Sequence, residues 1–484
     1  GLNTLNDIRG AIQWIAALTG KEIDLYDLPL DDEKTWKAFH DGRNETVFQF
    51  SKGIGVDLSR RSQPNSVDDL AQMTSAGRPG TMDALMPDGE TLLIDQWTGV
   101  RSGTKVAEYI HPSVEHILRE TGGVCLFQEQ ISAMFQVACG YTEEEADEIR
   151  EIVGKKQADK MKALVPEISR KLAASGWSET QVEPFISPCN AAAGYSFNKS
   201  HAVSYAYLGF ACQYLKENFP IEWWASVLQN SKKEDLRANS QYCAKYISPP
   251  DVNLSEVDVF IADKKGRSNL GRIVFPLRML HGVGTAAQYV AEKKPYSSLA
   301  DFFERVNRKK VNRGIVAKLI WSGAFDALCG VQKISDRNHI YSKYLKLYGG
   351  GEKEEFKPKN ELELMKAQGE AFPVIEPDYA AYAARIIGRP VSCVATVKKG
   401  VPGRRVRVAG IVREIFQLKT KKGDDMSFIS IANLDASASI TLFPETHSAN
   451  IDSIKEGEVI WVSGQVNEFN SRRSLIADEI KVIE

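Results

Sequence analysis

Apolar residues recur at helical spacing through the first half of the chain. Near its start, Ile8, Ala11, Ile12 and Ile15 fall on one face of a helix, which is the pattern of an amphipathic helix packed on a core. Comparable runs continue as far as a cluster of helix-breaking residues near position 250. The pattern therefore predicts a mainly helical first domain over residues 1–250.

Two helices of this domain carry recognisable boundary signals. Thr142 and Glu145 have the spacing of a capping box, in which each side chain satisfies a free backbone amide of the first turn. A helix over about 143–153 is expected to follow. A second helix is predicted over 204–218, ending ahead of Pro220, because proline disfavours the helical conformation in the residue before it.

Beyond the breaker cluster at residues 249–253 the apolar runs become short. The runs over 257–261 and 273–277 have the length of strands, and short helical runs return over 282–328. These patterns predict a second domain, of α+β class, over residues 251–345.

The end of the chain changes character again. Three glycines at 349–351 and the charged residues after them are typical of an exposed linker, which we assign to residues 346–395. Residues 396–484 then alternate between apolar and polar positions. The alternating runs lie at 406–412, 428–432, 439–441 and 459–465. They predict a small C-terminal antiparallel β-barrel, so the chain is expected to be multidomain.

Length and charge support this division. A chain of 484 residues is expected to form roughly three domains. Its 61 Lys and Arg residues nearly balance 63 Asp and Glu residues, which excludes a globally basic nucleic-acid binder. Basic residues nevertheless crowd into 293–318 and 398–422, so local basic patches remain.

The seven cysteines are widely spaced, odd in number and without a C-x-x-C pair, which is typical of reduced thiols in a cytosolic protein. No apolar run approaches the roughly 18 to 20 residues of a membrane span. The sequence thus predicts a cytoplasmic protein without a membrane partner. The chain begins with Gly1 rather than methionine, which indicates a processed product or a piece of a longer chain.

The first candidate for chemistry is a glycine-led turn over residues 194–201, ahead of the second predicted helix. A phosphate there would meet Lys199, His201 and free amides at the helix start, while Tyr195 could stack on a base or sugar. Asn198 adds an amide side chain to the same turn. The alternative is an ordinary capped helix start whose phenylalanine is buried.

A second candidate lies at the end of the helix over 143–153, where Arg150, Lys155 and Lys156 bring three cations together. Arginine is suited to bidentate contact with phosphate. The alternative is a solvated helix end, because the helix dipole by itself favours cations there by about a few tenths of a kcal/mol.

Two glycine turns, at 282–284 and 322–324, lie about forty residues apart between short helical runs. They have the form of paired helix-hairpin-helix turns, in which Gly282, Gly284 and Gly323 would allow close backbone approach and amides would hold a DNA phosphate without reading sequence. The nearby cations that would supply salt-dependent attraction are Lys293, Lys294, Lys309, Lys310 and Arg313. An ordinary connection between helices is the alternative.

The predicted barrel combines cations with aromatic residues. Its basic residues are Lys398, Lys399, Arg404, Arg405, Arg407, Lys419, Lys421 and Lys422. With Phe416, Phe428 and Phe469 interleaved, the mixture suits single-stranded nucleic acid, as in oligonucleotide-binding (OB-fold) barrels. Against this, Phe428 falls in an alternating strand and is expected in the core, and a charged strand face is commonly just solvated.

No Walker, G-x-G-x-x-G, H-E-x-x-H or G-x-S-x-G motif occurs in the sequence. The acidic residues Asp24, Asp27, Asp31 and Asp32 lie close together in a loop-like segment, and we interpret them as solvated caps. The sequence therefore predicts no catalytic residue and no metal ligand within this chain.

Several motifs occur in an ordered series along the chain. They lie at residues 30–35, 47–51, 78–80, 111–112, 122–124, 128–130, 154–156 and 197–201. In order and spacing they closely resemble the C-family bacterial replicative polymerases, the DNA polymerase III alpha subunits. The resemblance continues through the tandem hairpins and the barrel, and so covers nearly the whole chain.

The resemblance implies a fingers domain, then a tandem helix-hairpin-helix domain binding duplex DNA, then an OB-fold domain near the single-stranded template. Arg150, Tyr195 and His201 match family positions that contact the incoming nucleotide. Where the family commonly has a second arginine, this chain has Glu151, whose carboxylate would repel a triphosphate. Primer–template DNA and dNTPs are the implied partners.

The family's palm holds its metal-binding aspartates upstream of a segment like residues 1–5. Mg²⁺ and its carboxylate ligands, which two-metal phosphoryl transfer requires, are thus expected outside this chain, and the chain alone is expected to be inactive. No clear sliding-clamp peptide lies between residues 328 and 391, so clamp binding stays open. The competing hypothesis is a non-enzymatic DNA-binding scaffold that uses the hairpins and the barrel.

Overall fold

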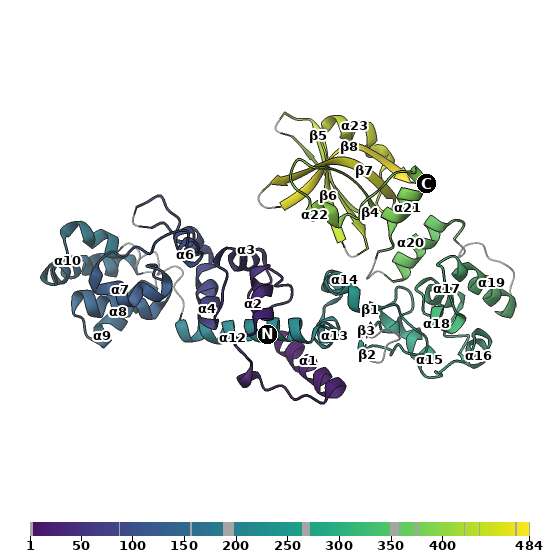
Figure 1. The fold of residues 1–484 in the computed structure, drawn as a ribbon, viewed down its shortest axis with the longest axis horizontal. Helices are drawn as coiled ribbons and strands as arrows, with labels where there is room; N and C mark the ends of the chain where they lie inside the picture. Colours follow the sequence, from purple (N-terminus) through teal and green to yellow (C-terminus); the bar gives the residue numbers. More distant parts are fainter. Residues whose placement is uncertain are drawn as a thin grey trace. The chain divides into compact units, whose positions relative to one another are not determined.

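The computed structural model describes ten stretches of the chain. They are residues 3–86, 88–154, 157–186, 198–263, 272–348, 358–372, 376–420, 422–434, 436–469 and 472–483. The chain forms two compact units, Gly1–Trp223 and Trp224–Glu484 (Figure 1). The division falls inside helix α13 (Pro220–Asn230), earlier than the boundary predicted near residue 250.

The first unit is helical, as predicted. Its α-helices are α1 (Asn3–Thr19), α2 (Glu33–His40), α3 (Gly53–Ser62), α4 (Val67–Ala76), α5 (Pro79–Met82), α6 (Leu93–Arg101), α7 (Glu115–Leu118), α8 (Gln128–Cys139), α9 (Glu143–Gly154), α10 (Ala158–Ala174) and α12 (Lys199–Asn218). No helix in the described part of the chain is long and apolar enough to cross a membrane.

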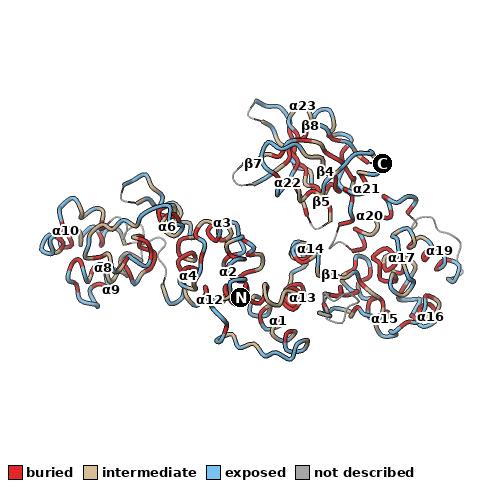
Figure 2. The backbone as a smooth tube through the Cα atoms, in the orientation of Figure 1, coloured by how far each residue is buried: buried red, intermediate tan, exposed pale blue. Residues whose placement is uncertain are grey.

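Helix α12 lies at the centre of the first unit and packs on α4 and α2. Phe210 is fully buried and its ring lies 5.0 Å from that of Trp36. Gly209 lets the helix approach closely, because a Cβ there would lie 2.5 Å from the ring of Phe50. Figure 2 marks the buried positions, which continue along α12 toward its C-terminal end.

The two predicted helices of this unit are present. Helix α9 begins with the predicted capping box: Thr142 N donates to Glu145 Oε2 over 2.8 Å, and Glu145 N donates to Thr142 Oγ1 over 3.3 Å. Helix α12 ends at Asn218 as predicted but begins at Lys199, earlier than expected. The reason is that the Asn198 side chain accepts from His201 N and caps the helix there.

The second unit starts with a small α+β region. Its elements are α14 (Lys233–Tyr242), β1 (Ile247–Ser248), β2 (Ile261–Asp263), β3 (Arg272–Val274), α15 (Ala287–Ala291), α16 (Leu299–Arg305), α17 (Arg313–Trp321), α18 (Asp326–Cys329) and α19 (Asp336–Tyr348). The strands form one sheet in the order β1-β3-β2. Strands β2 and β3 are shorter than predicted. Strand β3 stops before Pro276, which has no amide hydrogen to donate to a sheet. Phe260, predicted to lie in a strand, instead donates its backbone N–H to the Gln229 side chain.

The segment predicted as a linker contains helices. These are α20 (Glu361–Ala371) and α21 (Tyr379–Ile387), with α22 (Ala395–Lys399) at its end. Leu362, Met365 and Tyr379 are buried against the outer face of the barrel, where they meet Ile411 and Trp461. The glycine run at 349–351, which motivated the linker, lies outside the described residues.

The C-terminal region is a closed barrel with the strand order β4-β5-β6-β8-β7, as in an OB-fold. The strands are β4 (Arg405–Lys419), β5 (Asp425–Asn433), β6 (Ala436–Leu442), β7 (Val459–Phe469) and β8 (Arg472–Ile483), with α23 (Pro444–Asn450) after β6. The predicted barrel is confirmed, although β6 and β8 pair in parallel. Strand β8 was not predicted. Its pairing with β7 has a register shift opposite Ser463 and Gly464, so its inward side chains do not keep a regular alternation along the sequence.

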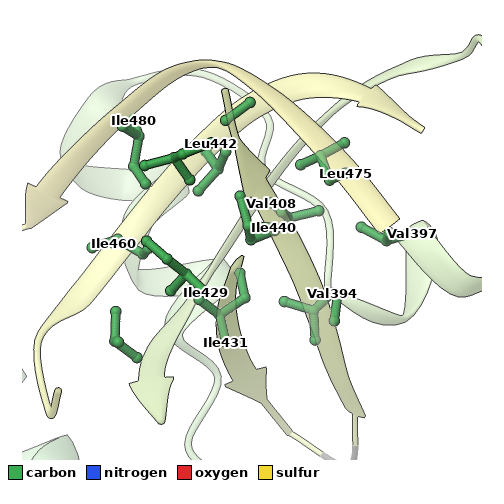
Figure 3. Packing of buried hydrophobic residues seen from close by; sticks show 14 of the residues in the cluster. Val394, Val397, Val408, Ile429, Ile431, Ile440, Leu442, Ile460, Leu475 and Ile480 are labelled. Atoms are coloured by element: carbon green, nitrogen blue, oxygen red, sulfur yellow. The ribbon is translucent and has the colours of Figure 1, made fainter. Parts of the chain in front are cut away.

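The barrel interior is filled by aliphatic side chains from all of its strands. Figure 3 shows Val408, Ile429, Ile440 and Leu475 converging, with Val397 of α22 beside them. In β5 the core residues Ile429 and Ile431 alternate with outward ones, and in β6 the core residues Ala436, Ala438, Ile440 and Leu442 do the same. This closed core fixes which side chains of β4 and β5 face solvent.

Candidate functional site

The predicted nucleotide-binding turn is described from Asn198 onward, and Tyr195 lies outside the described residues. Asn198 Oδ1 accepts from His201 N over 2.9 Å and from Ser200 Oγ over 2.6 Å. The capped helix start, which the sequence left as the alternative, is therefore present. The ring of His201 lies 4.1 Å from that of Tyr205, one turn further along α12.

Carboxylates already bind the groups that were predicted to hold a phosphate. Glu129 of α8 accepts from Asn198 Nδ2 over 2.8 Å and, through both oxygens, from Lys199 N over 3.0 Å. The ammonium of Lys199 lies 2.6 Å from Glu120 Oε2. The groups predicted to meet a phosphate at the start of α12 are therefore paired with the protein's own carboxylates in this conformation.

Arg150 is held in the same way. Its guanidinium makes two hydrogen bonds to Asp147, of 2.6 and 3.2 Å, and a third of 3.1 Å to Gln128 Oε1. The hydrogen bond to Asp147 raises the pKa of Arg150 and, reciprocally, lowers the pKa of Asp147. Lys155 and Lys156, the other two cations predicted here, lie outside the described residues.

A groove of about 1070 Å³ between α8 and α9 brings part of the predicted site together. Arg150, Asn198 and Glu129 all line it, whereas Lys199 and His201 are not among its lining residues. The other acidic residues of its lining are Glu143, Glu144, Asp147, Glu148 and Glu151. In the described stretches, no group of three or more His, Cys, Asp or Glu side chains has the arrangement of a metal site.

Sequence reasoning missed Glu120 and Glu129. Glu129 belongs to the motif at 128–130, which contributed to the resemblance without being given a role. Its partner Asn198 lies 69 positions away, so no local spacing could connect them. Asp147 is different, because it precedes Arg150 by three residues on one helix, a spacing that predicts an ion pair.

The two glycine turns connect helices as predicted. The first joins a short helical turn at Leu277–Met279 to another at Gly284–Ala286, and the second joins α17 to α18. Gly282, Gly284 and Gly323 have φ angles of +79°, +48° and +90°, a region that favours glycine. The second turn is also braced by Arg337, which donates to Asp326 and to Trp321 O.

The cations near the hairpins have different surroundings. Lys309 and Lys310 are exposed in the turn before α17, and Arg313 is the first residue of that helix. Lys294 lies 2.7 Å from Glu256 and is therefore neutralised. Lys309 and Lys310 remain the clearest candidates for contact with a phosphate backbone.

On the barrel, aromatic side chains face solvent from adjacent strands. Phe416 of β4 and Phe428 of β5 are cross-strand partners, with exposed fractions of 59% and 37%. The prediction that Phe428 belongs to the core is wrong: the inward positions of β5 are Ile429 and Ile431. Phe469, at the end of β7, is 73% exposed.

The basic residues of the barrel divide into two groups. Lys422 is exposed in the turn between β4 and β5, and Lys421 lies outside the described residues. Arg404 and Arg405 lie at the opposite end of β4, where Arg405 is 2.9 Å from Asp478. The predicted cations therefore lie at both ends of β4 and do not form one patch.

Three regions of the chain match known protein families. Residues 4–176 match the bacterial DNA polymerase III alpha subunit finger domain, residues 246–334 a helix-hairpin-helix motif, and residues 406–483 an OB-fold nucleic acid binding domain. The three matches follow the order in which the helical unit, the hairpins and the barrel occur in the chain.

Curated relatives extend over the whole chain. The DNA polymerase III subunit alpha of Aquifex aeolicus is 28% identical over 97% of this chain and 40% of its own length. That of Saccharopolyspora erythraea is 26% identical over 99% of this chain and 43% of its own length. That of Chlamydia trachomatis is 31% identical over 67% of this chain and 26% of its own length.

The chain thus spans about two fifths of the length of the first two relatives. Within that span it matches a finger domain, a helix-hairpin-helix motif and an OB-fold domain in that order. The chain therefore belongs to the family of the DNA polymerase III alpha subunits.

Proposed function

We propose that this chain is the part of a DNA-directed DNA polymerase that binds the incoming dNTP and the primer–template DNA. The observation that carries the proposal is the groove between α8 and α9, which brings Arg150 and the start of α12 together. Catalytic carboxylates are supplied from outside this chain in this proposal. By analogy with its relatives, the complete protein acts in the bacterial cytoplasm.

Nucleotide binding in the groove requires an exchange of anions. Arg150 offers a planar fork suited to two phosphate oxygens, and the start of α12 offers a backbone amide at Lys199. A triphosphate would take the places that Asp147 and Glu129 occupy on these two groups. In this proposal Arg150 and the start of α12 position the nucleotide, and the Mg²⁺ of the complete enzyme is held by carboxylates outside this chain.

The hairpins and the barrel supply the grip on DNA. Backbone amides at the glycine turns hold phosphates of a duplex without reading sequence, and Lys309 and Lys310 add electrostatic attraction. On the barrel, Phe416 and Phe428 offer stacking faces to unpaired bases, and Lys422 lies on the path of the backbone.

Replacing Phe416 or Phe428 by alanine should weaken binding of single-stranded DNA about five- to 150-fold, because each stacked base contributes roughly 1–3 kcal/mol. Fluorescence anisotropy with a labelled oligothymidylate measures the change. Tyr26, 95% exposed in the first unit, provides the matched control, and Tyr26→Ala should bind as the wild type does. Unchanged affinity in both phenylalanine variants would remove the barrel face from the proposal.

The alternative is a non-enzymatic scaffold that grips DNA through the hairpins and the barrel. The same DNA-binding surfaces support it, and it predicts identical behaviour of the Phe416 and Phe428 variants. It differs only at the groove between α8 and α9, which would have no nucleotide to bind. Experiments on Arg150 and Lys199 therefore distinguish the two functions.

A further inference from the structure

A carboxylate from helix α20 lies against the first hairpin. Glu370, in the last turn of α20, forms an ion pair with Lys318 of α17, and its Oε1 lies 3.5 Å from His281 Nδ1. The backbone joins the two segments as well, since His281 N donates to Ala371 O over 3.2 Å. This contact was invisible in the sequence, where the region of Glu370 was predicted to be a linker.

Lys318 lies beside the glycine turn itself. A Cβ built on Gly282 would be 3.5 Å from Lys318 Cγ and 3.8 Å from its Cε, whereas one built on Gly284 would meet nothing within 4 Å. The stem of Lys318 thus runs along the edge of the turn, and the space over Gly284 is open. An ammonium in this place is within reach of a phosphate that sits on the hairpin amides.

We propose that Lys318 is a phosphate contact of the first hairpin and that Glu370 covers it when DNA is absent. The proposal rests on the duplex-binding role given to the hairpins above. Glu370 is 57% exposed and the Lys318 side chain 24% exposed, and ion pairs this open to solvent are weak. A DNA phosphate, brought close by the amides of the turn, replaces the carboxylate as the partner of the ammonium.

The N-terminal part of α20 is anchored to the barrel. Leu362 and Met365 are buried against the barrel, and Lys366 pairs with Glu458 over 2.9 Å. The backbone of α20 is therefore fixed, and release of Lys318 needs only rotation of the Glu370 side chain. Glu370 acts as an internal competitor of the DNA backbone, and its removal is expected to strengthen duplex binding.

The test compares Glu370→Gln with Glu361→Gln in the full chain. Glu361 lies on the same helix and pairs with Arg385 over 2.6 Å at an exposed site, so both variants lose one negative charge from α20. Anisotropy of a labelled duplex of mixed sequence is measured over a series of salt concentrations. Glu370→Gln should bind about three- to tenfold more tightly than Glu361→Gln at low salt, with a similar salt slope, because the Lys318–phosphate contact forms in both variants and only its competitor is lost.

Removing Glu370 could strengthen DNA binding in two ways: by uncovering Lys318, or by removing a negative charge that repels the DNA. Repeating the comparison in a Lys318→Gln background separates the two. In that background Glu370→Gln and Glu361→Gln should bind the duplex equally. Equal binding in the wild-type background, or a Glu370 effect that survives without Lys318, overturns the proposal. If the wild type and every variant fail to bind duplex while binding single strands, the duplex-binding function itself fails, and the role of Glu370 fails with it.

Discussion

Replacing Arg337 by leucine should destabilise the hairpin region by about 3 kcal/mol, because it leaves a largely buried carboxylate without its partner. The Arg337 side chain is only 7% exposed and Asp326 is 27% exposed. The Arg337 guanidinium donates to both carboxylate oxygens of Asp326, over 3.0 and 2.6 Å, and to Trp321 O over 2.7 Å. One side chain therefore joins the end of α17 to the start of α18 across the second glycine turn.

Denaturant unfolding followed by circular dichroism measures this loss. Arg385→Leu is the matched control, since Arg385 pairs with Glu361 at an exposed site in the same unit and should cost less than about 1 kcal/mol. Replacing Asp326 by leucine as well should recover part of the loss, because no unpaired charge then remains. Equal midpoints for Arg337→Leu and Arg385→Leu would show that the bridge does not hold the turn.

Arg150→Ala, in a polymerase in which this chain is joined to a palm, should lower kcat/KM for the incoming dNTP by at least about 100-fold. Two charge-assisted hydrogen bonds to a phosphate would be lost, each worth roughly 1.5–3 kcal/mol, and every 1.4 kcal/mol is tenfold in rate. Steady-state primer extension at varied dNTP concentration gives the value, and a rise in KM larger than the fall in kcat would indicate loss of ground-state binding.

Arg119 provides the matched control for Arg150. It also lies in the first unit and pairs with a carboxylate of its own chain segment, Glu115, over 3.0 Å, but it does not line the groove between α8 and α9. Arg119→Ala should leave the kinetics of dNTP incorporation unchanged. If Arg150→Ala also leaves the kinetics unchanged, Arg150 does not contact the nucleotide, and the alternative of a solvated helix end holds.

Local signals in the sequence were sufficient for much of the fold. The capping box at Thr142 and Glu145 predicted α9, and alternation predicted strands β4 to β7. Failures occurred where distant parts of the chain decide the structure. The apolar residues of α20, such as Leu362, are covered by the barrel strands. The inward positions of β8 change phase at Asp478, which its pairing with β7 skips.

The candidate site was predictable only in part, for the same reason. Arg150 and Asn198 were identified and do meet at one groove. The carboxylates that bind them, Asp147 and Glu129, were not identified, although the sequence drew attention to Glu151 on the same helix as Asp147. Two residues act through contacts that only the folded chain brings together. Glu129 binds the predicted nucleotide-binding turn at Asn198 and Lys199. Arg337 braces the second glycine turn.

Chemical protection of Arg150 and Lys199 by nucleotide tests the central claim most directly. The palm-containing polymerase is bound to primer–template DNA with a terminated primer, treated with an arginine- or lysine-selective reagent, and analysed by mass spectrometry. The next templated dNTP should protect Arg150 and Lys199, a non-complementary dNTP should not, and Arg119 should react alike in every case. Equal modification of Arg150 and Lys199 with and without the templated nucleotide, alongside protection of Lys309 by DNA, would contradict the polymerase assignment and favour the scaffold.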